Sequence, residues 1–585
     1  MYDLERSEGM LRERFERKLN QRLENCFPGK VSAKVEEDCI RVIGQLEHWE
    51  DIVKACRMCV GKDRRLHVVN DIQLMDTDIP AMRVPKEVST ELEGMGPDVL
   101  IIGGGISGAS IARELSKWKL DILLVEKEGD LAMQASGRND GEVHPGVDLS
   151  RGSLKQHYVL PGNQLFDRIC EELDVPFKRR GQYACFKQKY YYPLVAAYAW
   201  HRRNICGVRD TKVIGKKELR KREPELNDEF EFALHNPSAG CVSPYALTIA
   251  YAENAVQNGA RVSLNTAVLG MEVTGHRIES VKTNKGTVYP RLVINAAGTF
   301  AEDVAAMAKD RFYSIHPRKG TNSILDKKAS HLVNSIASIK LITRSKTHTK
   351  GGGILRTVDE NLLVGPNAIE TYEKENFATE NNSIKEVFAK QKLTAKGLSE
   401  RDIITYFTGV RAATFEEDFV IEKGRKTKNL IHCAGIQSPG LTTAPAVALD
   451  VEAMAIEELS KTQAVIKNDS FHSRRKGIPV LRGMSNEERT KVIQNNPDYG
   501  IIICRCEEIS KGEIIDALNS PIPVPTIDGI KKRVRPGMGR CQGGFCMPLV
   551  AQIISEHENL SLQKVKKSGE AAYITLGETK GGTGC

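Results

Sequence analysis

Residues 98–126 read DVLIIGGGISGASIARELSKWKLDILLVE, which predicts a strand, a glycine turn, a helix and a second strand in direct succession. Gly103, Gly105 and Gly108 form the pattern G-x-G-x-x-G. The first glycine makes the tight turn, the second lets a pyrophosphate approach the backbone, and the third lets the helix pack on the strand. Glu126 ends the second strand, where a carboxylate can hold both ribose hydroxyls. The order of these parts predicts a Rossmann-like dinucleotide-binding domain, and the glycines alone leave FAD and NAD open.

The composition places limits on the class of protein. The chain has 585 residues, 41% of them hydrophobic and 27% charged, as in a soluble protein of several domains. The net charge of +8 is too dilute to predict a nucleic-acid partner. No run approaches the roughly 18 apolar residues of a membrane helix. Ten of the fourteen cysteines follow no regular framework and no export signal is visible, which predicts reduced thiols and a cytoplasmic protein.

A small module precedes the glycine motif. Apolar residues at helical spacing predict an amphipathic helix over residues 9–24. Residues 31–74 alternate as strand, helix and strand, and this pattern resembles the BON fold of bacterial proteins. Cys56 and Cys59 form a CxxC on the predicted helix, which indicates two small core residues rather than half of a zinc site. A polar linker over residues 76–97 then leads into the main domain.

Residues 135–146 read ASGRNDGEVHPG. This run resembles the flavin-contacting signature of the D-amino-acid-oxidase-type FAD superfamily. It is most similar to the families of the anaerobic glycerol-3-phosphate dehydrogenase large subunit and the L-2-hydroxyglutarate oxidases. Residues 240–268 are similar to the segment that lies against the adenine, 292–305 to the second dinucleotide signature, and 435–448 to the C-terminal loop over the isoalloxazine. The resemblance covers about 98–456 and implies FAD.

The same resemblance assigns residues to the cofactor site. It places at the FAD Gly103, Gly105, Ser107, Gly108, Glu126, Lys127, Ser136, Arg138, Asn139, Gly141, Val268, Gly298, Gly435, Gln437, Gly440 and Leu441.

One position departs from the resemblance. The glycerol-3-phosphate enzymes carry an arginine two residues after H-x-G, where it can meet a charged substrate. This chain has Gly146, Val147 and Asp148 there. An acid at this position disfavours a phosphorylated substrate and favours a small 2-hydroxy acid.

Oxidation of a C–H bond that bears a hydroxyl needs a base for the hydroxyl proton and a cation for the acid group of the substrate. His144 is the candidate base because imidazole titrates near neutral pH, and its alternative role is structural packing on the flavin ring. Arg318 is the first candidate clamp, since the family has a similar P-x-x-G stretch, and Arg411 is the second. A surface or structural ion pair is the alternative for either arginine.

Four cysteines form one constellation near the C-terminus, as CRC at 504–506 and CQGGFC at 541–546. Four thiolates can hold a zinc ion or a 2Fe–2S cluster, and C-x-C is too tight for common zinc fingers. The surrounding sequence resembles the bacterioferritin-associated-ferredoxin-like domain. The resemblance implies a 2Fe–2S cluster on Cys504, Cys506, Cys541 and Cys546. The basic run 531–535 either compensates the cluster charge, docks an acidic partner, or forms a solvated face.

These patterns predict an α/β protein with a Rossmann-like FAD domain and an inserted α+β substrate subdomain. The expected units are the module 1–90, the oxidoreductase 98–456, a linker 457–499, and the 2Fe–2S domain with its tail, 500–585. The expected function is an FAD-dependent dehydrogenase for glycerol 3-phosphate or a 2-hydroxy acid. Its electrons would pass through the cluster to a partner subunit or a quinone, and any membrane attachment would come from a partner.

Two other functions stay open at this point. The same superfamily oxidises C–N bonds, so an amine or amino-acid dehydrogenase is the nearest alternative. The other is an electron-transfer subunit of a larger dehydrogenase. A regulatory role of the N-terminal module is neither supported nor excluded.

Overall fold

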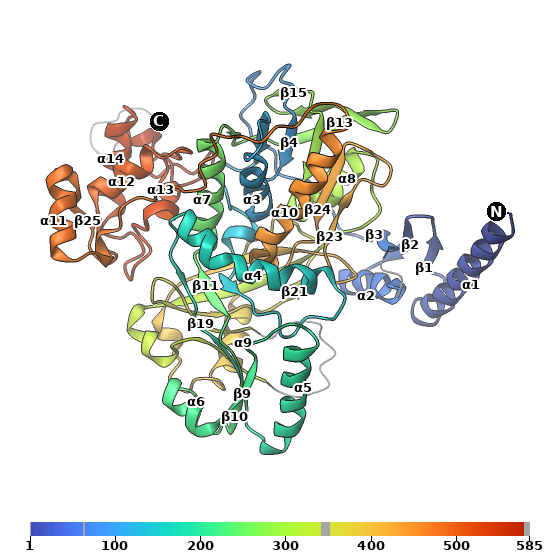
Figure 1. Cartoon of the computed structure of the whole chain (residues 1–585), viewed down its shortest axis with the longest axis horizontal. Coiled ribbons are helices and arrows are strands. Elements are labelled where there is room, and N and C mark those ends of the chain that lie inside the picture. Colours follow the sequence, from blue (N-terminus) through green and yellow to red (C-terminus); the bar gives the residue numbers. More distant parts are fainter. Residues whose placement is uncertain (1, 62–64, 341–351, 578–585) are drawn as a thin grey trace.

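The computed structural model describes residues 2–61, 65–340 and 352–577, with side chains from residue 12 onward (Figure 1). A six-stranded sheet forms the centre of the FAD-binding part, with five parallel strands and one antiparallel edge strand. In sheet order the strands are β12 (Arg261–Ser263), β5 (Ile122–Val125), β4 (Val99–Ile102), β16 (Leu292–Asn295), β24 (Leu430–Ala434) and β23 (Val420–Lys423).

The two faces of this sheet are covered differently. Val99, Ile101 and Leu124 point to one face and pack against helices. Leu100 and Val125 point to the other and pack against a three-stranded antiparallel sheet and the short helix α8. The second face is therefore covered by a small antiparallel sheet and one short helix rather than by a layer of long helices. The helices of the first face are α3 (Ile106–Leu115), α4 (Leu154–Glu172), α7 (Pro244–Gln257) and α10 (Gly440–Leu459); the second face carries β13 (Val268–Thr274), β14 (Arg277–Thr283), β15 (Gly286–Val288) and α8 (Ala301–Met307).

A nine-stranded sheet forms the inserted subdomain and has its own buried core. Its longest strands, β17 and β22, pair antiparallel and border the FAD-binding part. The strands are β21 (Ile369–Glu370), β17 (His316–Leu325), β22 (Ile403–Ala413), β20 (Leu362–Gly365), β19 (Gly353–Arg356), β18 (Ile336–Ile339), β8 (Gln182–Phe186), β10 (Phe232–Asn236) and β9 (Lys212–Gly215). Beside them lie α5 (Tyr192–Asn204), α6 (Lys216–Arg222), α9 (Asn381–Gln391) and a small sheet of β6 (Glu142–Val143), β11 (Gly240–Val242) and β7 (Phe177–Lys178).

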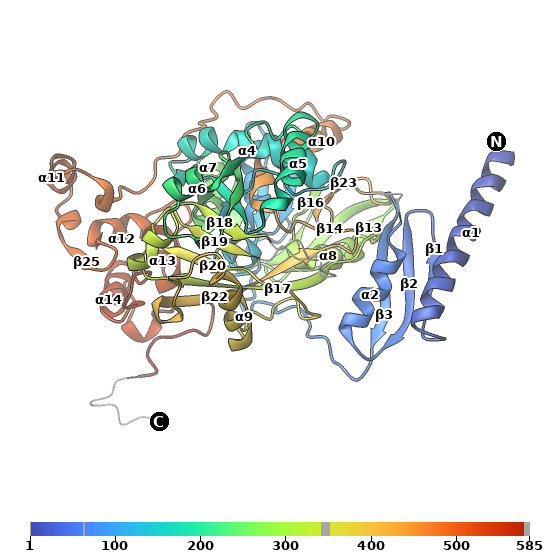
Figure 2. The same cartoon turned by 90° about the horizontal axis from the view of Figure 1, so that it is seen from below.

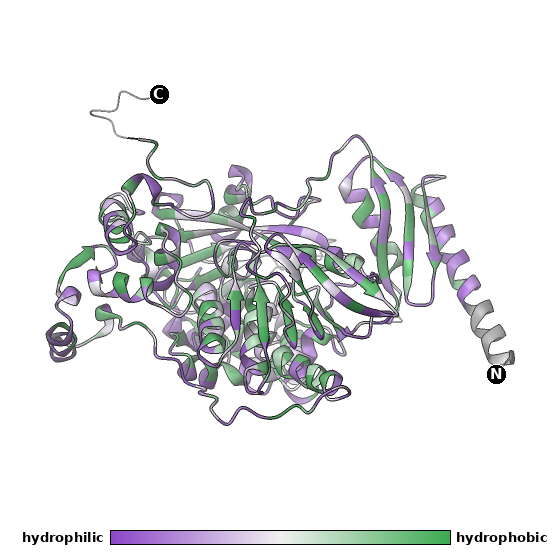
Figure 3. Cartoon of the chain, turned by 90° about the horizontal axis from the view of Figure 1, so that it is seen from above, coloured by the Kyte–Doolittle hydropathy of each residue, from purple (hydrophilic) through white to green (hydrophobic). Residues whose placement is uncertain are grey.

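The N-terminal module consists of α1 (Tyr2–Cys26), β1 (Val31–Val35), β2 (Cys39–Leu46), α2 (Trp49–Cys59) and β3 (His67–Leu74). Its strands show alternating hydrophilic and hydrophobic residues in Figure 3, as expected for a sheet with one buried face. Cys56 and Cys59 are both fully buried in the core of the module, so their prediction as core residues is confirmed. Helix α1 is longer than the predicted 9–24.

The C-terminal unit lies at the opposite end of the molecule from the N-terminal module (Figures 1 and 2). It contains β25 (Ile502–Cys504), β26 (Ile509–Ser510), α12 (Lys511–Leu518), α13 (Ile527–Val534) and α14 (Met547–His557) around one small core. The segment 457–499, predicted as an irregular linker, is not irregular throughout. Helix α10 extends into it to Leu459, and α11 (Asn486–Asn495) begins at a capping box formed by Ser485 and Glu488.

Candidate active site

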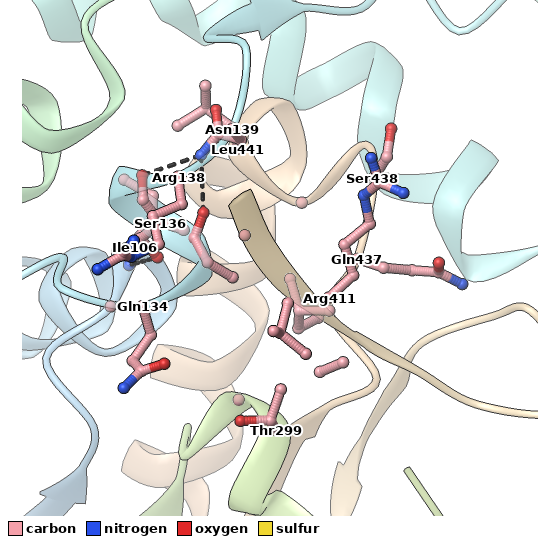
Figure 4. A pocket seen from close by; sticks show the side chains of 18 of the residues that line it. Ile106, Gln134, Ser136, Arg138, Asn139, Thr299, Arg411, Gln437, Ser438 and Leu441 are labelled. Atoms are coloured by element: carbon pink, nitrogen blue, oxygen red, sulfur yellow. Dashed lines mark hydrogen bonds between the residues drawn. The ribbon is translucent and has the colours of Figure 1, made fainter. Parts of the chain in front are cut away.

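A cavity of about 360 Å³ lies at the carboxyl ends of β4, β5 and β16 and reaches β17 and β22 of the larger sheet. Open α/β sheets bind ligands at this place, outside the carboxyl ends of their parallel strands. Figure 4 shows Ser136 and Asn139 on one side of the cavity and Gln437 and Ser438 on the other. The cavity therefore runs between the FAD-binding part and the inserted subdomain.

The N-terminus of α3 opens onto this cavity, where backbone amides can face a phosphate. Gly103 has a φ of +112°, and a Cβ there would lie 2.4 Å from the carbonyl oxygen of Ala296. A Cβ on Gly108 would lie 2.0 Å from the carbonyl oxygen of Gly103. Both positions therefore require glycine, the first to make the turn and the second to let helix and strand pack.

Glu126 follows β5 and lines the cavity with a buried carboxylate. The carboxylate accepts the amide of Gly104 at 2.6 Å and the amide of Glu128 at 2.9 Å. Burial raises the pKa of Glu126, and these two backbone hydrogen bonds oppose the rise. The side chain is thus held by the turn that it faces, at the position where a ribose is expected.

Most of the residues predicted to bind the cofactor line the cavity. Three do not: Gly108, Gly141 and Gly435 lie behind its surface, where each glycine lets other backbone or side-chain atoms approach closely. The segment 435–448, predicted as a loop, becomes helix α10 from Gly440 onward. The lining residues from the prediction are Gly103, Gly105, Ser107, Glu126, Lys127, Ser136, Arg138, Asn139, Val268, Gly298, Gln437, Gly440 and Leu441.

His144, the candidate base, lines the middle of the cavity. Its Nδ1 lies 3.2 Å from Oε1 of Glu142, and its Nε2 lies 3.3 Å from Oγ of Ser438. The backbone of His144 is also fixed, because its amide donates to Thr442 Oγ1 and its carbonyl accepts from Asn163. Glu142 therefore orients the imidazole so that Nε2 faces Ser438 on the cavity wall.

Arg318 lines the cavity but is held by two carboxylates. Its Nε lies 3.0 Å from Glu370, and its two terminal nitrogens bond Glu417, one of them at 3.2 Å. The charge and hydrogen bonds of Arg318 outweigh burial and lower the pKa of Glu417 to about 2. Arg318 thus forms the structural ion pair that the sequence left open, and its role as a substrate clamp stays a prediction.

Arg411 has a different environment on the neighbouring strand β22. Among the described residues, its guanidinium donates one hydrogen bond, from Nη2 to the carbonyl oxygen of Asn367 at 3.2 Å. Withdrawal from solvent lowers the pKa of Arg411, and the charge of Asp140 opposes this. Its guanidinium lines the cavity (Figure 4), which makes it the better-placed of the two candidate clamps.

Sequence reasoning missed two acids of the site. Glu142 shares one face of an extended segment with His144, so the alternation of strand side chains was a usable signal. Glu417 belongs to the run 416–418, which looks like a solvated charged surface. Only the fold brings it to Gln437 and Arg318.

The four C-terminal cysteines come together on the small domain. Sγ of Cys506 lies 3.6 Å from Sγ of Cys541. The hydrogen bond with Cys546, helped by backbone amides of Gly537 and Glu507, lowers the pKa of Cys504 to about 6 against its burial. A set of four neighbouring sulfurs supported by amides suits a metal cluster that takes thiolates.

The basic run beside these cysteines docks on the same chain. Lys532 and Arg533 both bond the buried carboxylate of Asp130, at 3.3 and 3.2 Å. Arg535 bonds Asp359 at 2.8 Å. The prediction of a partner-docking or solvated face is therefore corrected for these three residues, because Lys532 and Arg533 hold the cluster domain against the FAD-binding part and Arg535 holds it against the inserted subdomain.

Comparison with known proteins agrees with this geometry. Residues 98–454, more than half of the chain, match the family model described as FAD dependent oxidoreductase. The chain belongs to this family. Residues 502–556 of this oxidoreductase match the BFD-like [2Fe-2S] binding domain.

Two curated relatives and one solved structure extend the comparison. The oxidoreductase is 36% identical to the glycerol 3-phosphate dehydrogenase of Caloramator mitchellensis, over 83% of this chain and 99% of that protein. It is 24% identical to the anaerobic glycerol-3-phosphate dehydrogenase subunit A1 of Haloferax volcanii, over 77% of this chain and 81% of that protein. The FAD-bound L-alpha-glycerophosphate oxidase of Mycoplasma pneumoniae superposes with a TM-score of 0.59 at 25% identity, over 65% of this chain and 98% of that chain.

FAD and a 2Fe–2S cluster are thus the cofactors, and the residues present fit both. The glycine turn, the amide-rich helix N-terminus and Glu126 suit the dinucleotide, and the four gathered sulfurs suit the cluster. Within the described ranges, no helix combines the length and apolar character needed to cross a membrane.

Proposed function

We propose that this oxidoreductase oxidises the secondary alcohol of glycerol 3-phosphate. The observation that carries the proposal is Arg411, a partly buried guanidinium on the cavity wall whose hydrogen bond within the described residues goes to a backbone carbonyl rather than to a carboxylate. A planar guanidinium can bind two oxygens of a phosphate at once. The named activity of the 36% identical relative, which spans nearly its whole length, supports the same substrate.

The cofactors and the residues of the cavity have separate roles in the proposed oxidation. Bound FAD supplies the hydride acceptor, and the cluster supplies a one-electron carrier. We assign to Nε2 of His144 the proton of the substrate hydroxyl, and the Nδ1 contact with Glu142 supports this assignment. Arg411 holds the acid group. The electrons leave by way of the cluster domain to a redox partner subunit or a quinone.

A 2-hydroxy acid is the second candidate substrate, and Asp148 favours it. This acid lines the cavity, where its negative charge opposes a doubly charged phosphate more than a single carboxylate. The two substrates share the alcohol and the anionic group, so His144 and Arg411 keep the same roles for either one.

Anaerobic titration of the purified protein tests the proposal. Glycerol 3-phosphate should bleach the flavin absorbance, and loss of cluster absorbance should follow. Bleaching by 2-hydroxy acids alone would favour the second candidate, and bleaching by amino acids alone would make the protein an amine dehydrogenase. If dithionite reduces both centres and none of these compounds does, the isolated chain is an electron-transfer subunit.

The same titration on Arg411→Gln tests the clamp. Loss of a charge-assisted pair should raise the half-saturating concentration of glycerol 3-phosphate about 10- to 100-fold. The matched control is Arg401→Gln, an exposed arginine just before the same strand, and it should leave the titration unchanged. Equal behaviour of the two variants would remove Arg411 from the site.

A further inference from the structure

The N-terminal module docks on the FAD-binding part through the free edge of β3. Among the strands that the structure describes, β3 pairs with β2 alone. On its other side the amide of Val68 donates to Glu416 Oε1 at 2.7 Å, and the amide of Asn70 donates to Ser314 Oγ at 2.9 Å. These bonds give partners to backbone amides that would otherwise be unpaired at the edge of the sheet, and they fix the module in one orientation.

This docking brings Arg57 of α2 to the wall of the cavity. Its Nη2 lies 2.9 Å from Oε1 of Glu370 and 2.9 Å from Oε1 of Glu417. These are the two carboxylates that bond Arg318. Two guanidinium groups, one from the module and one from β17, therefore share the same pair of acids.

The charge balance of this cluster depends on Arg57. Glu370 and Glu417 carry two negative charges, and Arg318 alone neutralises one of them. Glu417 lines the cavity and also accepts a hydrogen bond from Gln437 at 2.8 Å. His316, which lies 2.9 Å from the second oxygen of Glu370, adds positive charge only when it is protonated. Loss of Arg57 would therefore remove one of the positive charges that balance this acid pair beside the cavity.

We propose that Arg57 of the N-terminal module is a positioning residue of the active site, which neutralises the Glu370–Glu417 pair and so makes the cavity compatible with an anionic substrate. Arg57 acts through Glu417 and Arg318, and it does not contact the cavity itself. The module is then part of the catalytic unit rather than a separate regulator. This inference rests on the proposed function for its anionic substrate.

Two measurements on the FAD-loaded, full-length protein test it without relying on turnover. In Arg57→Gln, the flavin midpoint potential should become more negative, because electrons are harder to add beside uncompensated negative charge. The dissociation constant for inorganic phosphate, measured by isothermal titration, should rise about tenfold, as expected for loss of one positive charge near the anion. If neither value moves, Arg57 has no role in the site.

Two further variants separate charge from docking. Arg425 bridges the same two units by donating to the carbonyls of Asp38 and Arg65, at 2.6 and 2.8 Å, and it does not touch the acid pair. Arg425→Gln should leave both values near those of the wild type. Arg57→Lys keeps the charge and should restore both to within about twofold. Equal changes in the Arg57→Gln and Arg425→Gln proteins, or no rescue by lysine, would overturn the inference.

Failure of the proposed substrate gives a different result. If glycerol 3-phosphate does not bleach the wild-type flavin, the proposed function is wrong. The potential and the phosphate affinity still report on Arg57 in that case, because neither needs turnover.

Discussion

At the residue scale, Glu417 links two walls of the cavity and also contributes to the stability of the fold. It accepts hydrogen bonds from Gln437, in the segment predicted to cover the flavin, and from Arg318. Although burial raises its pKa, Arg318 lowers the pKa of Glu417 to about 2, below the ordinary 4.5. The unfolded chain therefore binds this proton more readily than the folded chain. The resulting stability is complete above about pH 4.5 and is lost as the pH falls toward 2.

We therefore expect Glu417→Gln to lower the free energy of unfolding by about 2 kcal/mol at pH 7. The difference from the wild type should shrink below about pH 4, where the ionised carboxylate of Glu417 contributes less to the stability of the wild type. Thermal melts of both proteins from about pH 2.5 to about pH 8, a range that covers most of this titration, would measure the difference. Glu400→Gln removes an exposed pair with Lys392 and should change little at any pH. A pH-independent difference for Glu417→Gln would contradict the argument.

At the element scale, α13 holds the cluster domain in place. Its Lys532 and Arg533 converge on Asp130, whose side chain is 5% exposed, so removal of the carboxylate leaves two cations without their partner. Breaking such a buried arrangement costs roughly 3 kcal/mol. Asp130→Asn should therefore loosen the docked domain, and amide hydrogen exchange in residues 527–534 should accelerate.

The neighbouring acid of the same helix supplies the control. Asp528 pairs with Lys567 inside the cluster domain at 2.8 Å, on a more exposed surface. Asp528→Asn should leave the exchange of α13 close to that of the wild type. Unchanged exchange in Asp130→Asn would mean that other contacts dock the domain.

At the scale of the whole molecule, the N-terminal module and the cluster domain occupy opposite ends of the FAD-binding part (Figure 1). Helix α7 connects cavity and cluster domain. Its Tyr245 hydroxyl contacts Arg535 at 3.0 Å and Met538 at 3.3 Å, while its first turn packs against the cavity segment at Gly141. Both contacts come from the first turn of α7, which therefore touches the cavity segment and the cluster domain at once.

Because the four cysteines belong to a domain with its own core, Cys506→Ala should remove the cluster and leave the flavin site intact. Iron content and the electron paramagnetic resonance signal should be lost, while the substrate still bleaches the flavin. Reduction of a one-electron acceptor should fall more than about tenfold. Cys26→Ala, which changes an exposed cysteine of α1, should alter none of these. Loss of flavin bleaching together with the cluster would show that the two sites are not independent.

The sequence predicted both cofactors and the class of fold, through its motifs and the family resemblances that they carry. The glycine turn and the four cysteines are recognisable because each lies in one or two short segments whose backbone geometry the ligand demands. His144 and Glu142 are also close in the sequence, because they are two residues apart. The sequence patterns also suggested the module, the linker and the helices, although α11 and the antiparallel cover of the central sheet were not foreseen.

Only the tertiary structure decided what the arginines do. Arg318 meets Glu417 across 99 residues, and Arg57 meets Glu370 across 313. Long charged side chains find partners wherever the fold places opposite charge, and no local pattern encodes that choice. The fold therefore paired Arg318 with acids, presented Arg411 to the cavity, and carried Arg57 from a separate module to the same wall.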